Sequence, residues 1–281
     1  MGMHDDIEAA VRAAGLTIGA PRAWSLAREL PAAEAIAGEL RGDGYLDLPG
    51  LIPPALVAEC RAAIELCVAR GAPAVCGFAF DALWQLVPLL APIAACGLGC
   101  PVEVLDSFWA WHVHGESARG WPPHRDRPER AFTPERDLAS MTLWVALSDA
   151  TVRNGCIYVA PAPWDYEYYN PQARHMVSSM QHIRALPATA GTVMGWTHAL
   201  LHWGTAAAAN EPARISVGFE FVRAGYDTSD ERFPTQIFPG LADRCAIIGA
   251  QITKYRHMHE LPDAAFAPVS PFLGALRRAF D

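Results

Sequence analysis

The sequence predicts a mainly β protein with flanking helices, built around a β-sandwich or β-barrel core. Apolar residues in the first hundred positions recur at helical spacing, whereas short apolar runs separated by turn signals begin at Ser107. The run from 214 to 222 alternates apolar and polar residues at the period of a strand. A chain of 281 residues is long enough for one such domain with added helices.

The helical parts flank this core on both sides in the sequence. Pro53 and Pro54 open a segment with apolar residues at helical spacing, and Gly71 is placed to end it. A further helix is expected at about 241–257, followed by a proline-rich end. We therefore predict one catalytic domain, with a helical part at about 1–100, a β core at about 104–223 and a helical extension at about 224–281.

Residues 82–102 form an uncharged segment that is long enough to cross a bilayer. Pro88, Pro92 and Pro101 would interrupt a membrane-spanning helix repeatedly. The sequence favours a buried helix followed by irregular chain, and we expect no membrane partner.

Four runs are predicted to be strands of the core. They are Ser107 to Val113, Met141 to Leu147, Cys156 to Ala160 after the turn dipeptide Asn154-Gly155, and Arg214 to Val222. The last run has one apolar face and one face that combines polar residues with a glycine. The apolar face carries Ile215, Val217, Phe219 and Phe221, and the other carries Arg214, Ser216, Gly218 and Glu220.

Composition excludes several classes of protein. The formal net charge of -8 argues against a nucleic-acid partner, because such binding needs a basic surface. The 7 cysteines are odd in number and lack a Cys-x-x-Cys pair, which indicates reduced thiols. No secretory or transit signal is visible at the N-terminus, so we expect a cytoplasmic location. The sequence does not indicate an oligomeric state.

His124 and Asp126 are candidate metal ligands. Residues at i and i+2 of an extended segment point the same way, so both side chains can reach one ion. Two imidazoles and one carboxylate bind iron(II) on one face and leave positions open for a bidentate co-substrate and oxygen. A second His-x-Asp pair, His4 and Asp6, lies in a terminus expected to fray, and we interpret it as chance.

The third ligand has two candidates, His198 and His202. We favour His202, because the segment before it is predicted to be a strand and the next strand begins at Arg214. The remaining histidines are interpreted as hydrogen-bonded or solvated side chains, and they are His112, His114, His175, His182, His257 and His259.

Arg214 and Ser216 share one face of the last predicted strand. A guanidinium binds a carboxylate through two parallel hydrogen bonds, and a hydroxyl two residues further on can add a third. The distal carboxylate of 2-oxoglutarate requires such an anchor. The alternative is an ordinary surface arginine at the start of a strand.

With these residues identified, the sequence resembles the phytanoyl-CoA dioxygenase family of iron(II)- and 2-oxoglutarate-dependent oxygenases, from about Arg41 to Val222. The order and spacing of the motifs carry the resemblance. The motifs are Gly42-Asp-Gly-Tyr-Leu-Asp-Leu-Pro-Gly-Leu-Ile-Pro-Pro, His124-Arg-Asp126, Thr142-Leu-Trp-Val-Ala-Leu-Ser-Asp-Ala, Asn154-Gly155, His202 and Arg214-Ile-Ser216.

This resemblance implies a double-stranded β-helix, also called a jelly roll or cupin-like core, with the N-terminal helices packed on one side. It implies iron(II) held by His124, Asp126 and His202, with 2-oxoglutarate anchored by Arg214 and oxygen as the other co-substrate. Trp144 matches a position beside the co-substrate. The implied activity is hydroxylation, or another oxidation, of an unactivated carbon, with release of succinate and carbon dioxide.

The substrate is expected to be a small hydrophobic or ring-containing molecule. Four tryptophans near the predicted mouth are candidates for its pocket: Trp111, Trp121, Trp164 and Trp203. The family commonly has Pro-Gly-Ser-His after the Asn-Gly turn, whereas this chain has Ala160-Pro-Ala-Pro-Trp164, which weakens any inference of an acyl-CoA substrate. Two rivals remain, a jelly-roll binding protein without catalysis and a metal enzyme of this fold that does not use 2-oxoglutarate.

Overall fold

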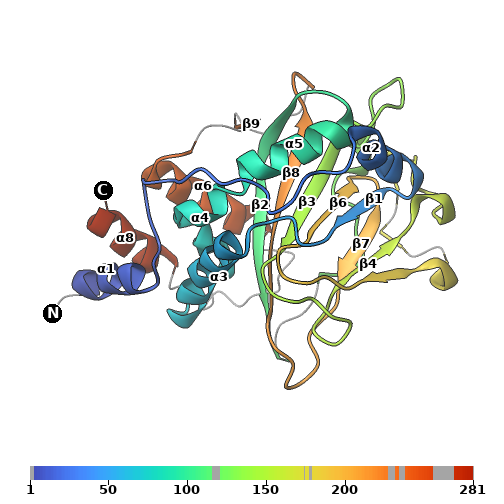
Figure 1. Cartoon of the computed structure of the whole chain (residues 1–281). Helices are drawn as coiled ribbons and strands as arrows, with labels where there is room; N and C mark the ends of the chain where they lie inside the picture. The colour runs from blue at the N-terminus through green and yellow to red at the C-terminus, as the bar shows by residue number, and fades with distance from the viewer. Residues whose placement is uncertain are drawn as a thin grey trace.

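The computed structural model describes residues 3–115, 121–173, 175–176, 179–226, 232–233, 238–255 and 269–280. Its strands form two antiparallel sheets, of six strands in the order β1-β6-β3-β8-β2-β9 and of three in the order β5-β4-β7 (Figure 1). The strands are β1 (Tyr45–Leu48), β2 (Val102–Val113), β3 (Ser140–Ala146), β4 (Ile157–Ala160), β5 (Arg184–Leu186), β6 (Val193–Thr197), β7 (Leu201–Gly204), β8 (Arg214–Arg223) and β9 (Arg232–Phe233).

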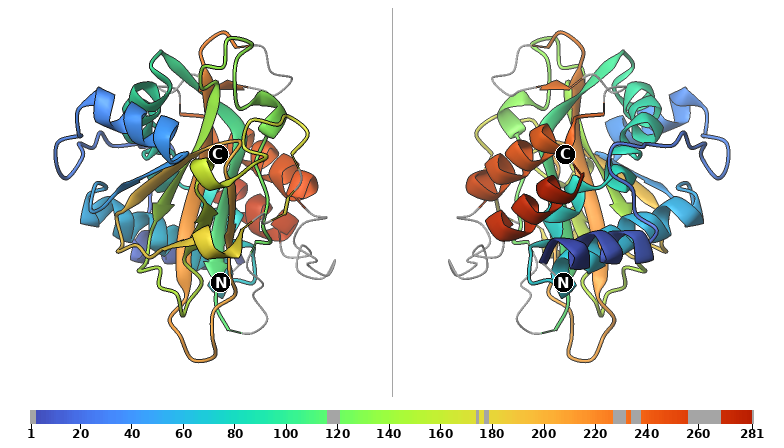
Figure 2. Two further views of the ribbon diagram at one scale, coloured as in Figure 1. Left: turned by 90° about the vertical axis from the view of Figure 1, so that its right-hand side faces the viewer. Right: turned by 90° about the vertical axis from the view of Figure 1, so that its left-hand side faces the viewer.

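Helices cover one face of the six-stranded sheet, and the smaller sheet lies on its other side (Figures 1 and 2). The α-helices are α1 (Met3–Ala13), α2 (Ala33–Gly42), α3 (Pro54–Ala69), α4 (Asp81–Trp84), α5 (Val87–Leu98), α6 (Leu241–Tyr255) and α8 (Val269–Phe280). Helix α1 packs against α8, so helices from both ends of the chain lie on the same side. The short 3-10 helices are η1 (Ala74–Ala79), η2 (Pro128–Arg130), η3 (Ala162–Trp164) and η4 (Met180–His182).

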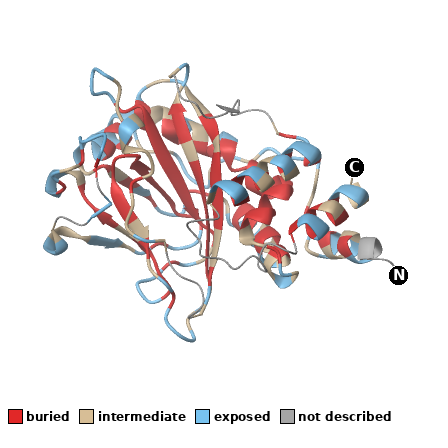
Figure 3. Cartoon of the chain, turned by 180° about the vertical axis from the view of Figure 1, so that it is seen from behind, coloured by how far each residue is buried: buried red, intermediate tan, exposed pale blue. Residues whose placement is uncertain are grey.

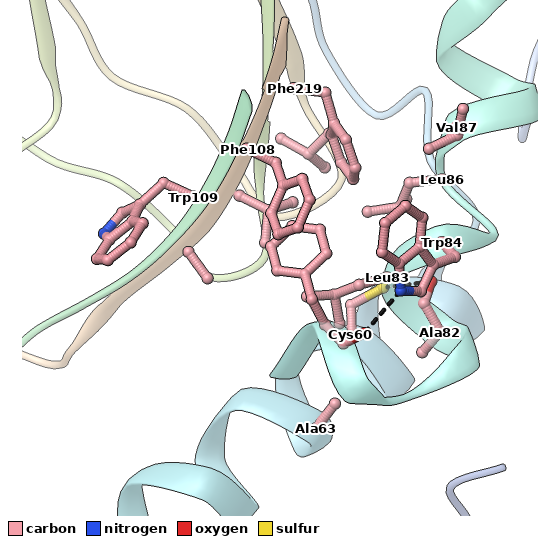
Figure 4. Packing of buried hydrophobic residues seen from close by; sticks show 14 of the residues in the cluster. Cys60, Ala63, Ala82, Leu83, Trp84, Leu86, Val87, Phe108, Trp109 and Phe219 are labelled. Carbon is pink, nitrogen blue, oxygen red and sulfur yellow. Dashed lines mark hydrogen bonds between the residues drawn. The ribbon is translucent and has the colours of Figure 1, made fainter. Parts of the chain in front are cut away.

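Strand β8 separates the apolar core from the interior between the sheets. Its apolar face, which includes Phe219, packs against η1 and α4 together with Phe108 of β2 (Figure 4). The ring centroids of Phe78 and Phe219 lie 5.5 Å apart, and those of Trp84 and Phe108 lie 5.4 Å apart. Burying each such side chain contributes about 1.5–3 kcal/mol. Figure 4 shows Trp109 on the opposite side of the strand from Phe108, as the alternation of β residues requires.

Both faces of the central strands are covered. All seven residues of β3 are buried, and buried residues continue through the sheet into the helices (Figure 3). A second apolar cluster joins β3 and β6 to β4 of the smaller sheet, through residues such as Trp144, Met194 and Ile157. The inner face of the large sheet therefore carries both apolar packing and the polar residues that are described below.

The uncharged segment is buried within the helical layer. Within the described residues, Asp81–Leu98 is one helical stretch that is long and apolar enough to cross a membrane, and 72% of it is buried inside the protein. The buried helix that the sequence favoured is present, but Pro92 does not interrupt it: α5 continues through Pro92 and ends at Leu98, with Gly99 at φ 69° as its C-cap. Tertiary packing of the helix against the sheet outweighs the lost hydrogen bond.

The two chain ends also depart from the sequence expectation. Residues 3–13, expected to fray, form helix α1, whose buried Ile7 and Val11 join the main core. The proline-rich end is helical at 269–280, with Phe272 and Leu276 buried and Pro271 in the first turn, where proline is tolerated. An amphipathic face packed on the core explains both helices.

The turn at Asn154-Gly155 precedes β4 as predicted. Gly155 has φ 88°, and a Cβ at this position would lie 2.1 Å from the carbonyl oxygen of Thr205. The side-chain oxygen of Asn154 accepts a hydrogen bond of 2.6 Å from the amide of Thr151. All seven cysteines are free thiols, which agrees with the predicted reduced state.

Candidate functional site

A cavity of about 550 Å³ lies on the inner face of the six-stranded sheet. His124 and Asp126 reach it from the segment that follows β2, and His202 reaches it from β7. The amide of His124 donates to the carbonyl of His202 at 3.0 Å, and the amide of His202 donates back at 3.0 Å. This backbone bridge brings together two histidines that are distant in the sequence.

The three side chains point their ligand atoms at one another. One ligand atom from each of His124, Asp126 and His202 lies within 4.8 Å of the others. Oδ1 of Asp126 is 3.4 Å from Nε2 of His124 and 3.5 Å from Nε2 of His202. Among the described residues, this is the group of histidine, cysteine and carboxylate side chains that could hold a metal ion.

Hydrogen bonds orient both imidazoles. Nδ1 of His124 lies 2.8 Å from the carbonyl of Pro122, and Nδ1 of His202 lies 3.0 Å from the carbonyl of Leu200. Because a carbonyl only accepts, Nδ1 must carry the proton in each ring. Nε2 of each neutral ring is then left with its lone pair directed into the site, as metal ligation requires.

Asp126 is fixed in the same way. Its Oδ2 accepts hydrogen bonds from Thr142 Oγ1 at 2.6 Å and Trp196 Nε1 at 2.9 Å, which leaves Oδ1 facing the histidines. Burial raises the pKa of Asp126, but His202 and His124 together lower it by a larger amount. The pKa of Asp126 therefore lies well below its ordinary value. Burial lowers the pKa of His202 to about 4. The site therefore holds one carboxylate and a neutral imidazole near neutral pH, which are the forms that bind metals.

Arg125, between two of these residues, points away from them into a buried ion pair. Its Nη1 and Nη2 contact the two carboxylate oxygens of Asp165 at 2.6 and 3.0 Å. Its amide donates to Nδ1 of His175 at 3.0 Å. This pair was not predicted, because nothing in the sequence indicates that Asp165 lies beside the His-x-Asp segment.

Arg214 lines the same cavity and is 2% exposed. Its Nη1 lies 3.5 Å from Ser216 Oγ, and its Nε is buried without a hydrogen-bond partner among the residues that the structure describes. A Cβ on Gly204 would lie 3.1 Å from Nη2, so the glycine leaves room for the guanidinium. Burial lowers the pKa of Arg214 to about 10, and the group remains a cation at neutral pH.

A buried guanidinium without an acidic partner is costly unless an anion neutralises it. The indole of Trp144, in the same cavity, also has a buried Nε1 without a partner among the described residues. A carboxylate of 2-oxoglutarate fits these donors, and the group formed by His124, Asp126 and His202 fits iron(II). The donor set thus suits both cofactors that the resemblance implies.

The four tryptophans expected at the substrate pocket are not all brought together. Trp111, Trp121 and Trp203 line the cavity. Trp164 instead lies outside it, 47% exposed, with its ring stacked on His182 at a centroid distance of 4.0 Å. The expectation for Trp164 is therefore corrected. Helix η3, which follows β4, turns this side chain outward.

His198, the alternative candidate for the third metal ligand, is buried beside Glu220. Its Nε2 lies 3.8 Å from Oε2 of Glu220, and it is not part of the group of three ligand atoms. Burial lowers its pKa to about 4. Cavity residues that the sequence analysis did not single out include Arg127, Thr142, Trp196, Gly204, Lys254 and Tyr255.

Two histidines and a carboxylate beside a buried arginine, inside paired antiparallel sheets, define an iron(II)- and 2-oxoglutarate-dependent oxygenase, an oxidoreductase. Residues 78–214 match the family described as Phytanoyl-CoA dioxygenase (PhyH). The predicted resemblance and the class of enzyme, with iron and 2-oxoglutarate as its cofactors, are thereby confirmed.

Solved structures share the fold. The non-haem α-ketoglutarate-dependent epimerase SnoN from nogalamycin biosynthesis matches with a TM-score of 0.55 and 21% identity, over 73% of this chain and 87% of its own. EctD from S. alaskensis, solved with 2-oxoglutarate and 5-hydroxyectoine, matches with a TM-score of 0.53 and 16% identity, over 80% and 88%. AviO1 from Streptomyces viridochromogenes Tue57 matches with a TM-score of 0.53 and 19% identity, over 74% and 100%. The comparison with curated proteins gave no match. The predicted jelly-roll fold is confirmed.

Proposed function

We propose that this oxygenase hydroxylates, or otherwise oxidises, an unactivated carbon of a small hydrophobic or ring-containing metabolite and releases succinate and carbon dioxide. The observation that carries the proposal is the pairing of two sites in one cavity. A group of three candidate metal ligands, with imidazole lone pairs directed into the site, lies in the same cavity as a buried arginine for which the described residues supply no acidic partner. Neither feature stabilises an empty protein.

The residues have distinct roles in this proposal. His124, Asp126 and His202 hold iron(II), and the guanidinium of Arg214, with Ser216 beside it, holds the distal carboxylate of 2-oxoglutarate. Trp144 lies next to this co-substrate and can donate its indole N–H. When bound, iron with 2-oxoglutarate and oxygen supplies the oxidising chemistry.

The protein's own contribution is orientation and exclusion of water. The carbonyls of Pro122 and Leu200 fix the two imidazoles, and Thr142 with Trp196 fixes the carboxylate of Asp126. Trp111, Trp121 and Trp203 are among the residues that line the cavity, which supports an aromatic or alicyclic substrate. Such walls keep water away from the oxidised carbon.

The substrate is proposed to be a free small molecule. The structural neighbours include SnoN solved with nogalamycin RO and EctD solved with 5-hydroxyectoine, which supports a small-molecule partner. The departure from the family pattern after Gly155 gives no support to an acyl-CoA substrate. A cytoplasmic location, the single-domain organisation and the absence of nucleic-acid or membrane partners remain predictions.

The test is the release of succinate. The protein is loaded with iron(II) without oxygen, mixed with a metabolite library and exposed to air, and succinate and oxidised products are measured by mass spectrometry. We expect succinate formation that requires both iron and 2-oxoglutarate, and one metabolite class that gains oxygen or loses hydrogen in step with it. Iron binding without any turnover would favour a binding protein. Product formation without 2-oxoglutarate would favour a metal enzyme of another kind.

A further inference from the structure

The cavity contains a second polar cluster, which the metal and co-substrate sites do not use. It consists of Ser107, Arg127, Glu220, Lys254 and Tyr255, all of which line the cavity. These side chains come from β2, β8, α6 and the segment after Asp126. We call this group the Glu220 cluster.

The Glu220 cluster lies away from the 2-oxoglutarate end of the cavity. Arg214 and Glu220 both belong to the inner face of β8, at positions that are about 20 Å apart along a strand. Thr142, which holds Asp126, pairs with Glu220 in the register of β3 and β8. The cluster therefore adjoins the metal ligands on the side that remains for the substrate.

The cluster presents charges of both signs. Nε of Arg127 lies 2.7 Å from Oε2 of Glu220, and Nη2 of Arg127 donates to Ser107 Oγ at 2.7 Å. Lys254 lies at an exposed position of α6, and its ammonium also contacts Ser107 Oγ. The hydroxyl of Tyr255 lies 3.5 Å from the same Ser107 Oγ. A carboxylate has about four lone-pair sites and an ammonium has three N–H donors, so both retain capacity for a ligand.

The charges of both signs in the Glu220 cluster determine which functional group of a ligand can bind there. An ammonium group would be repelled by Arg127 and Lys254, and a carboxylate or phosphate, although these two cations attract it, would be repelled by Glu220. A hydroxyl carries no charge, donates one hydrogen bond and accepts others. It can therefore donate to Glu220 while it accepts from a cation, and it avoids the cost of burying a charge beside a like charge.

An aromatic wall connects the cluster to the metal ligands. The ring centroids of Trp111 and Trp121 lie 6.0 Å apart, those of Trp121 and Tyr255 lie 5.9 Å apart, and those of Trp121 and His124 lie 5.4 Å apart. A Cβ on Gly218 would lie 3.2 Å from the ring of Trp111, so the glycine lets this ring approach β8 closely. Trp111 and Tyr255 lie nearly perpendicular to Trp121, at 75° and 74°, so the wall offers both ring faces and ring edges to a bound ring system.

We propose that the substrate is an uncharged ring compound that bears a hydroxyl group, with the ring against the wall of Trp111, Trp121 and Tyr255 and the hydroxyl bound by Glu220, Arg127 and Lys254. This inference rests on the proposed function, because it assigns the remaining part of the same cavity. Glu220 acts as the specificity-determining residue. Its carboxylate accepts a hydrogen bond from the hydroxyl of the substrate, and its negative charge excludes anionic analogues.

The test compares matched ring probes on the holoenzyme. Protein loaded with iron(II) and 2-oxoglutarate without oxygen is dialysed to equilibrium against 2-naphthol, 2-naphthoate, protonated 2-(aminomethyl)naphthalene and 2-methylnaphthalene. We expect 2-naphthol to bind at least about tenfold more tightly than the other three, as the loss of one hydrogen bond to a charged group predicts. Equal binding of all four, tighter binding of either charged probe, or no retention of the naphthol would overturn the proposal.

The variant Glu220→Gln separates recognition from a structural role. We expect the preference for 2-naphthol over 2-methylnaphthalene to fall about tenfold and 2-naphthoate to gain affinity, because the repelling charge is removed. The control Glu211→Gln removes a partly buried carboxylate that pairs with the exposed Arg153 and does not line the cavity, and it should leave the ranking unchanged. If Glu220 only fastens α6 to the sheet, its variant will lose stability but keep the wild-type ranking.

Failure of this inference is distinguishable from failure of the proposed function. Iron-dependent succinate release from 2-oxoglutarate is measured on the same preparations. Release of succinate with no preference among the probes would overturn the hydroxyl assignment alone. A preparation that binds iron but never consumes 2-oxoglutarate would overturn the proposed function, whatever the probes show. The wild-type ranking decides the inference even if Glu220→Gln does not fold.

Discussion

Arg214 buries a guanidinium whose Nε has no partner among the described residues, in a cavity that it shares with the three candidate metal ligands. A cation in that position is unfavourable in the empty protein and favourable once a carboxylate arrives. Gly204 leaves the space that the guanidinium occupies. At the scale of single residues, the site is thus arranged for ligands that the chain itself does not supply.

Replacing Arg214 tests the anchor directly. We expect Arg214→Ala to raise the apparent KM for 2-oxoglutarate by about 30-fold to several thousand-fold, which corresponds to about 2–5 kcal/mol for truncating a buried charge pair. The variant Arg214→Lys should restore only part of the affinity for 2-oxoglutarate, because lysine keeps the positive charge but lacks the planar guanidinium that makes two parallel hydrogen bonds. Succinate release at limiting 2-oxoglutarate measures the effect. The control Arg184→Ala removes an exposed arginine paired with Asp43 and should change little. An unaltered 2-oxoglutarate requirement in Arg214→Ala would move the anchor elsewhere.

Alanine substitutions of His124, Asp126 and His202 test the metal assignment. Each should abolish turnover and weaken iron binding by at least about tenfold, while most of the fold remains, because the apolar clusters do not contain these side chains. Iron content after gel filtration and circular dichroism are the measurements. The matched control is His198→Ala, which should retain stoichiometric iron. Loss of iron in His198→Ala but not in His202→Ala would show that the distal ligand is wrongly assigned.

At the scale of elements, two pairings assemble the site. The backbone bridge between His124 and His202 attaches the segment after β2 to β7. The buried ion pair of Arg125 with Asp165 attaches the same segment to the residues after β4. The His-x-Asp segment is irregular, so these contacts, rather than a continuous strand, hold its side chains in place.

Removing Asp165 should therefore loosen the segment. We expect Asp165→Ala to lower the free energy of unfolding by about 3–5 kcal/mol, because it leaves the guanidinium of Arg125 buried without its partner. Urea unfolding measures this change. The double variant Arg125→Met with Asp165→Leu should recover part of the loss, since no unpaired charge stays buried. A single variant as stable as the wild type would show that water or other groups satisfy Arg125.

At the scale of the whole molecule, the six-stranded sheet has two different faces. Its outer face packs on helices from both ends of the chain, and its inner face carries the cavity. The outer face therefore contributes apolar packing, whereas the inner face combines a second apolar cluster with the site. Ligand binding to the inner face should stabilise the fold without rearranging the helical layer.

Ligand-dependent melting tests this view. Ligands at about 100 times their dissociation constants stabilise a folded protein by about 2.7 kcal/mol, which corresponds to an increase of about 5–10 °C in Tm for a chain of this size. We expect iron(II) and then 2-oxoglutarate, without oxygen, to raise the Tm in two increments. Arg214→Ala should keep the first increment and lose most of the second. Stabilisation of that variant by 2-oxoglutarate equal to the wild type would contradict the assigned anchor.

The sequence by itself determined four strands of the core, the resemblance to the phytanoyl-CoA dioxygenase family, and the candidates His124, Asp126, His202 and Arg214. These follow from local signals: alternation at the period of a strand, the i, i+2 spacing of ligands, and motif order. Tertiary structure alone decided that Trp164 points outward, that α5 continues through Pro92, and that Asp165 pairs with Arg125. It also brought Arg127, Glu220 and Lys254 into one cluster. These outcomes depend on contacts between segments that are distant in the chain, and no local pattern of residues encodes them.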